Sequence, residues 1–84
     1  MATLIDFVAW AETQRRAAEM IGLSESMMSL ILSGKRSLLP EHAIRAERAS
    51  KGLYRADDLL PDAEFVRDAR GEVTGWHVRA EQDS

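Results

Sequence analysis

The side chains best suited to molecular recognition lie within GLSESMMSLILSGKR, residues 22–36. At helical spacing, one side of this stretch carries Ser24, Glu25, Ser26, Ser29 and Leu30. A serine hydroxyl can hydrogen-bond to any base, a glutamate can accept from the cytosine amino group, and a leucine can contact a thymine methyl. Lys35 and Arg36 follow directly and suit the phosphate backbone. The stretch therefore favours contact with double-stranded DNA.

The sequence lacks the patterns that enzymes use. It has no cysteine, which excludes disulfides, cysteine–zinc sites and thiol chemistry. His42 and His77 stand alone, without a second ligand at metal spacing. No Gly-x-Ser-x-Gly, phosphate-binding glycine loop or paired-histidine motif occurs, and the serines have no histidine nearby in sequence. We therefore expect no enzymatic activity, no cofactor and no metal.

Caps and apolar periodicity predict the helices that position these residues. Thr3 and Asp6 resemble a capping box before a helix that ends near Ala11. Thr13 precedes a helix over 14–21, and Ser24 precedes one over about 25–33. The sequence thus predicts three short helices within the first 33 residues.

Two further helices are predicted after Gly34. Pro40 suits the first position of a helix that runs to about Ser50, with Ala43 and Ile44 buried together with Ala46 or Ala49. The segment RADDLL (55–60) predicts a short fifth helix that Pro61 ends. The fold class expected is therefore mainly α.

The spacing between the second and third helices is more specific than amphipathicity requires. Ala18 is small enough for a close helix crossing, and Gly22 can adopt the left-handed conformation of the turn. The core-facing positions that follow are Leu23, Met28, Ile31 and Leu32. This is the helix-turn-helix pattern, in which the outer face of the second helix enters the major groove. Gln14, Arg15 and the free N–H groups beside them suit phosphate.

The last segment changes to strand periodicity. We expect a β-hairpin in which Phe65–Arg67 lie opposite 72–74, with Val66 facing Val73 and Arg67 facing Glu72. Gly71 supplies a positive φ for its loop, and residues 80–84 are expected to fray. Two roles remain open for the apolar residues of this segment, a dimer interface or a cover for the helical core. These residues are Phe65, Val66, Val73, Trp76 and Val78.

The totals indicate one small domain whose charge is divided along the chain. The 84 residues carry a net charge of −3, but residues 13–55 hold eight basic and four acidic side chains. Residues 56–84 hold three basic and eight acidic ones. A positive middle segment therefore precedes an acidic end, which suits an anionic partner for the first. With no apolar run of membrane-span length and no signal-peptide pattern, we expect a cytoplasmic protein without a membrane partner.

The stretches TQRRAAEMIGLSESMMSLILSGKR and AERASKGLYRADDLLPD, with Pro40 between them, resemble the lambda-repressor-like helix-turn-helix family. Within it they resemble the small phage Cro and YdaS-like regulators. The resemblance implies a compact bundle of four or five helices, here expected as a five-helix domain over residues 1–62. The hairpin of 63–79, predicted from strand periodicity, follows as an extension outside the helical part of the resemblance, and a strand-forming C-terminus resembles how some Cro proteins dimerise. It implies dimeric binding to operator DNA and repression of transcription, in the nucleoid of a bacterial or phage-infected cell.

Two other interpretations stay open. Residues 13–36 can be a plain helical hairpin, and Lys35 and Arg36 can be a solvated loop. The chain can also be an antitoxin-like or adaptor module whose acidic C-terminal part binds a protein such as a toxin. In the family it resembles, some members combine DNA binding with a toxin partner.

Overall fold

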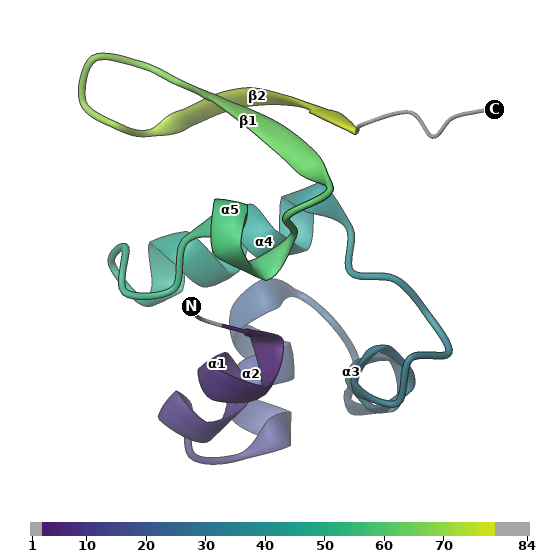
Figure 1. Cartoon of the computed structure of the whole chain (residues 1–84). Helices are drawn as coiled ribbons and strands as arrows, with labels where there is room; N and C mark the ends of the chain where they lie inside the picture. Colours follow the sequence, from purple (N-terminus) through teal and green to yellow (C-terminus); the bar gives the residue numbers. More distant parts are fainter. Residues whose placement is uncertain (1–2, 79–84) are drawn as a thin grey trace, which may run out of the picture.

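Five helices and one antiparallel strand pair account for most of the chain. The computed structural model describes residues 3–78. In chain order the elements are α1 (Leu4–Trp10), α2 (Gln14–Ile21), α3 (Glu25–Leu32), α4 (Pro40–Ala49), α5 (Ala56–Leu59), β1 (Ala63–Arg67) and β2 (Val73–Val78) (Figure 1). The mainly helical class with a two-stranded antiparallel sheet is therefore confirmed.

Side-chain caps begin the first three helices, as the sequence predicts. Thr3 Oγ1 accepts from the Asp6 amide at 3.3 Å, and the Asp6 carboxylate accepts from the Thr3 amide at 3.0 Å. Thr13 accepts from the Arg16 amide at 3.0 Å, and Ser24 accepts from the Met27 amide at 3.1 Å. Each bond satisfies an amide that lacks a partner within its helix, so the helix ends are defined locally.

The core lies where α1, α2, α3 and α4 meet. Phe7, Ile21 and Met28 are its largest fully buried side chains. Around them are small buried residues, namely Ala11, Ala17, Ala18, Ala43, Ala46 and Ala56. Alanine lets helix backbones approach closely, which suits a short chain with few large apolar side chains. The sequence left open whether Ala46 or Ala49 of α4 is buried. Ala46 is buried and Ala49 is exposed.

The strand register differs from the predicted one. Val66 lies opposite Gly75 and Arg67 lies opposite Val73, with a bulge between Val66 and Arg67. Directly opposed residues share a face of the sheet. A bulge can therefore place Val73 and Trp76 on the same face of the sheet, although they are three positions apart in the chain. The predicted pairs of Val66 with Val73 and of Arg67 with Glu72 are therefore wrong.

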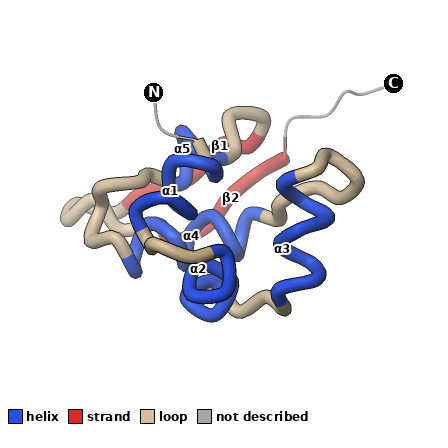
Figure 2. Tube along the Cα trace, turned by 90° about the horizontal axis from the view of Figure 1, so that it is seen from below, coloured by secondary structure: helices blue, strands red, loops and turns tan. Residues whose placement is uncertain are grey.

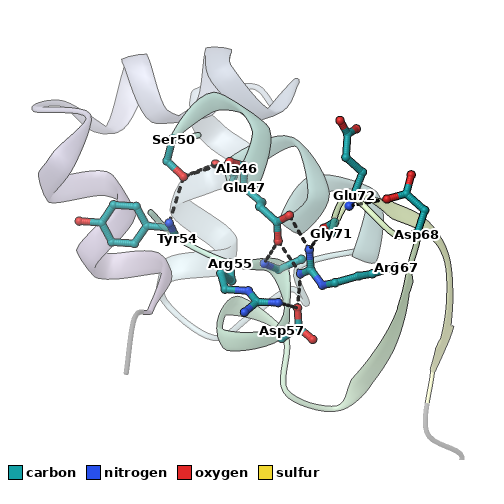
Figure 3. A network of polar contacts seen from close by, with 11 residues as sticks. Ala46, Glu47, Ser50, Tyr54, Arg55, Asp57, Arg67, Asp68, Gly71 and Glu72 are labelled. Atoms are coloured by element: carbon teal, nitrogen blue, oxygen red, sulfur yellow. Dashed lines mark hydrogen bonds and ion pairs between the residues drawn. The ribbon is translucent and has the colours of Figure 1, made fainter. Parts of the chain in front are cut away.

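The physical reason lies in the loop and in the helices beneath it. The Asp68 carboxylate accepts from the amides of Arg70 at 2.8 Å and Glu72 at 3.0 Å, so it closes the loop itself. Arg67 turns instead to α4 and α5 (Figure 3). The first strand also begins at Ala63, two residues before the predicted start, and Ala63 pairs with Val78.

One arginine ties the hairpin to the helices. Arg67 donates from Nη1 to Glu47 Oε2 at 2.8 Å and from Nη2 to Glu47 Oε1 at 2.7 Å. It also donates to the Asp57 carboxylate and to the Gly71 carbonyl (Figure 3). Glu47 Oε1 accepts in addition from the Ala56 amide at 2.9 Å, at the start of α5. Glu47 thus joins α4, α5 and β1.

The same contacts shift the ionisation of both partners. The hydrogen bond from Arg67 lowers the pKa of Glu47, and it outweighs partial burial, which acts in the opposite direction. The hydrogen bond to Glu47 raises the pKa of Arg67. Both side chains are mostly buried, at 17% exposure for Arg67 and 14% for Glu47. The pair is therefore ionised and protected from solvent screening.

Candidate functional site

Helix α3 lies to one side of the other helices. Figure 1 shows it nearly end-on, and Figure 2 shows it along its length, beside α2 and α4. Its only buried residue is Met28, while Ile31 and Leu32 are half-buried and pack against the core. These are the three residues predicted to face inward. A helix that buries one narrow stripe leaves most of its surface to solvent.

The predicted outer face of α3 is accessible. Ser24, Glu25, Ser26 and Ser29 are all exposed. Leu30 is half-buried rather than fully outward, and Met27, which the sequence leaves unassigned, is half-buried as well. The polar part of the predicted face therefore lies on the surface, with Leu30 at its margin.

A left-handed glycine joins α2 to α3. Gly22 has φ 79°, and the Leu23 amide donates to the Ala18 carbonyl at 2.8 Å. The turn is as predicted. The structure adds a contact that the sequence does not signal, because the Arg45 guanidinium of α4 lies over Gly22. A Cβ at Gly22 would lie 2.0 Å from Arg45 Nη1.

The starts of α2 and α3 are joined by a side chain. Gln14 Nε2 donates to the Glu25 carbonyl at 3.4 Å, and Gln14 is half-buried. Its predicted role at phosphate thus coexists with a bond inside the chain. Arg15 remains exposed and pairs loosely with Glu19, at 3.8 Å between Nε and Oε2. Such surface pairs hold a side chain only weakly, so Arg15 can leave Glu19 for another anion.

The other end of α3 carries the second pair of predicted contacts. Lys35 and Arg36 are exposed, and neither forms an ion pair in the part of the chain that the structure describes. Their amides donate to the Leu30 carbonyl at 2.9 and 3.2 Å, which folds the chain back after Gly34. The exposed serines of α3 therefore lie between Arg15, near its start, and Lys35 and Arg36, past its end.

The five residues considered for dimerisation divide into two groups. Val73 is buried at 9% exposure, and Phe65 packs against the same core, so both cover the helices. Val66 and Trp76 are exposed at 46% and 44%. Val78 pairs with Ala63 in the sheet, and its side chain lies outside the described residues. Among the four of these side chains that the structure describes, Val66 and Trp76 are thus the two that are accessible to a second copy.

A further titratable side chain lies in α4. His42 is half-buried, and burial lowers its pKa although Glu41 acts against this. Its Nδ1 makes no hydrogen bond within the described part of the chain. Among residues 3–78, no three His, Cys, Asp or Glu side chains lie where they could hold a metal ion together. None of the helices described is long and apolar enough to cross a membrane.

Comparisons with protein-family profiles, with curated proteins and with solved structures found no match for this chain. What it does has to be inferred from its own residues.

Proposed function

We propose that this chain is a sequence-specific DNA-binding transcriptional regulator of the lambda-repressor-like type, similar to Cro and YdaS-like repressors. In this proposal α2 and α3 form a helix-turn-helix, and α3 is the recognition helix. One observation carries it. Helix α3 buries only Met28 and exposes Ser24, Ser26 and Ser29 directly after the left-handed turn at Gly22.

Each exposed side chain of this face has a role in the proposal. The serines and Glu25 contact base edges, where donors and acceptors distinguish the base pairs. Arg15, Lys35 and Arg36 contact phosphates on either side, which fixes the position of α3 in the groove. Residues 13–36 carry four basic and two acidic side chains, so this region is locally positive although the whole chain is negative.

The arrangement of the elements also suits an approach to DNA from this side. In Figure 1 the hairpin lies across α4 and α5, on the other side of the molecule from α2 and α3. The described acidic residues of the hairpin are therefore kept away from α3. In a dimer, two copies of α3 would have to reach major grooves about 34 Å apart, one turn of the duplex.

Binding to DNA can be tested by selecting duplexes from a random pool and measuring their affinity by fluorescence anisotropy. We expect a defined sequence preference and an affinity that falls as salt rises, since each phosphate contact releases a counterion. Ser29→Arg should change the preferred sequence. Lys35→Ala should weaken binding to all sequences alike and make the salt dependence shallower by about one unit of log–log slope.

Arg70→Ala is the matched control for Lys35→Ala. It removes the same charge from an exposed residue of the hairpin loop. Figure 1 shows this loop on the other side of the molecule from α3. We expect it to leave the sequence preference and the salt slope unchanged. Folded protein that binds no duplex at low salt, or equal losses from the two variants, would contradict the proposal.

A protein-interaction module is the second candidate, favoured by the exposure of Val66 and Trp76 on the hairpin. In this candidate the acidic C-terminal part of an antitoxin-like or adaptor protein binds a partner. Salt separates the two candidates, because an apolar protein interface responds little to salt and phosphate binding responds strongly.

A further inference from the structure

A hollow of about 370 Å³ lies where the start of α1, the end of α3 and the end of α5 meet. Its volume falls within the range of about 300–1,000 Å³ that is usual for small-molecule sites. Seven of the ten residues that line it are apolar, and six of these are Leu4 and Ile5 of α1, Ile31 and Leu32 of α3, and Leu59 and Leu60. The hollow is therefore large enough for a small molecule and is mostly apolar.

The floor and the rim of this hollow differ in exposure. Leu38 and Leu59 are buried, at 8% and 9% exposure. Ile5 also lines the hollow, but its side chain is 68% exposed. Because burial of apolar surface is favourable, a ligand with an apolar body gains free energy by covering Ile5.

The charge at the hollow has one sign. Arg36 is the only charged residue among those that line it, and it forms no ion pair with any residue from 3 to 78. Asp6 and Asp58 are neighbours of lining residues in the chain, but neither lines the hollow. The Asp6 carboxylate instead accepts from the Thr3 amide and hydroxyl. The lining therefore favours an anion.

We propose that this hollow binds a small amphipathic anion, a molecule with an alkyl or aryl body and one carboxylate. The body lies over Leu38 and Leu59 and covers Ile5. The carboxylate pairs with the Arg36 guanidinium, and the hydroxyl of Ser37, which also lines the hollow, donates to the same group. This site is distinct from the exposed serines of α3.

The bound anion also acts on DNA binding, and this part of the inference rests on the proposed function. There Arg36 contacts a phosphate, so the carboxylate and the duplex compete for one guanidinium. Ile31 and Leu32, from the inner side of α3, line the hollow as well, so the ligand lies against the proposed recognition helix. We therefore expect the ligand to weaken binding to DNA.

Two other occupants fit the hollow less well. A two-fold contact between copies sets one surface against the same surface of the other copy. Two Arg36 side chains would then approach each other, with no carboxylate in either lining. A protein interface uses roughly 20–30 residues a side, whereas ten residues line this hollow. A small anion satisfies both the size and the charge.

The first test titrates the full chain with octanoate and follows the amide resonances by NMR. We expect saturable shifts at Leu4, Ile31 and Leu60, with a dissociation constant on the order of 1 mM for so small a ligand. Octylammonium has an alkyl chain of the same kind and the opposite charge, so it should bind more weakly. Arg36→Ala should weaken octanoate binding about threefold, the value of one exposed ion pair.

A variant at the rim separates the two anions. Ile5→Gln removes apolar contact without adding charge, so octanoate affinity should fall about fivefold. Because Ile5 is exposed and is not a proposed DNA contact, duplex affinity without octanoate should stay unchanged. Leu53→Gln is the matched control, since Leu53 is 60% exposed and does not line the hollow.

The competition is measured by anisotropy with the selected duplex. Octanoate should weaken duplex binding by the wild-type chain and have less effect on Ile5→Gln. Acetate at the same concentration controls for ionic strength and should have little effect. Octanoate that binds and leaves duplex affinity unchanged would overturn the competition at Arg36.

Failure of DNA binding and failure of anion binding are separate results. If the folded chain binds no duplex, the NMR titration still decides whether the hollow takes the anion. The proposed site is overturned if octylammonium binds as well as octanoate, or if Ile5→Gln and Leu53→Gln have equal effects. It is also overturned if the chain dimerises and octanoate does not bind.

Discussion

Arg67 of β1 and Glu47 of α4, twenty residues apart in sequence, form a two-bonded ion pair with N–O distances of 2.8 and 2.7 Å. A planar guanidinium fits a carboxylate in this geometry, which fixes direction as well as distance. Because Glu47 also accepts from the Ala56 amide, the pair sets the position of α5 relative to the hairpin. The pair therefore helps to hold the hairpin against α4 and α5.

Removing one partner of this pair should be costly. Arg67→Met keeps much of the side-chain volume but leaves Glu47 mostly buried and without its cation. We expect the free energy of unfolding in urea to fall by about 3 kcal/mol. Arg15→Met breaks an exposed helical pair with Glu19 and should cost less than about 0.5 kcal/mol. Equal effects of the two variants would show that the Arg67 contact adds nothing to stability.

Stability should fall in acid because of Glu47. Its pKa is lowered in the native state from an ordinary value of 4.5, chiefly by the hydrogen bond from Arg67. The stabilisation is thus complete above pH 4.5 and is lost as the pH falls from there through the native pKa. Urea unfolding midpoints between about pH 3 and 6 should show this decline. Glu47→Gln should reduce it, and an unchanged decline in that variant would assign the effect to other carboxylates.

A second pH dependence should come from His42. Burial lowers its native pKa below the ordinary value of 6.5, so the folded state favours the neutral ring. The unfolded chain binds the proton more readily, and stability is lost as the pH falls from 6.5 through the native pKa. In the His42→Gln variant, the unfolding midpoint should depend less on pH in this window. His77→Gln, at an exposed strand position, is the control and should keep the decline.

Sequence reasoning succeeded where the cause of a structure is local. The caps of α1, α2 and α3 and the turn at Gly22 each depend on residues within one helical turn, so spacing alone predicts them. The exposure of the serines of α3 likewise follows from helical periodicity around Met28. The same periodicity predicts that Leu30 faces outward, whereas in the structure Leu30 is half-buried.

It failed where contacts join distant residues. The bulge between Val66 and Arg67 follows from Asp68 closing its loop and from Glu47 holding Arg67, and neither is visible in strand periodicity. In the candidate site, the same holds for the Gln14 bond to Glu25 and for Arg45 over Gly22. Glu12 and Lys51 adopt positive φ values. Such values are uncommon outside glycine, so the residue types at these two positions do not predict them.

The turn between α2 and α3 should tolerate substitution poorly. Gly22 has φ 79°, and an alanine there should cost about 1–2 kcal/mol of unfolding free energy. Gly34 has φ 83° with no atom near its missing Cβ, so Gly34→Ala measures the backbone effect alone. We expect Gly22→Ala to cost slightly more, because it also displaces Arg45. In an Arg45→Ala background the two glycine variants should become equal, and a persistent difference would locate the extra cost elsewhere.

Ser24 allows the stability of α3 to be separated from its proposed contact with DNA. Its hydroxyl accepts from the Met27 amide at 3.1 Å, so Ser24→Ala should lower the free energy of unfolding by about 1 kcal/mol. Ser24→Asp retains a capping acceptor at the helix N-terminus and should change stability by less than about 0.5 kcal/mol. The added negative charge should nevertheless weaken DNA binding through repulsion from phosphate, and anisotropy should show this. Because the helix stays intact, weaker binding by Ser24→Asp reports contact with DNA and not loss of fold. Unchanged affinity in that variant would place the start of α3 away from the duplex.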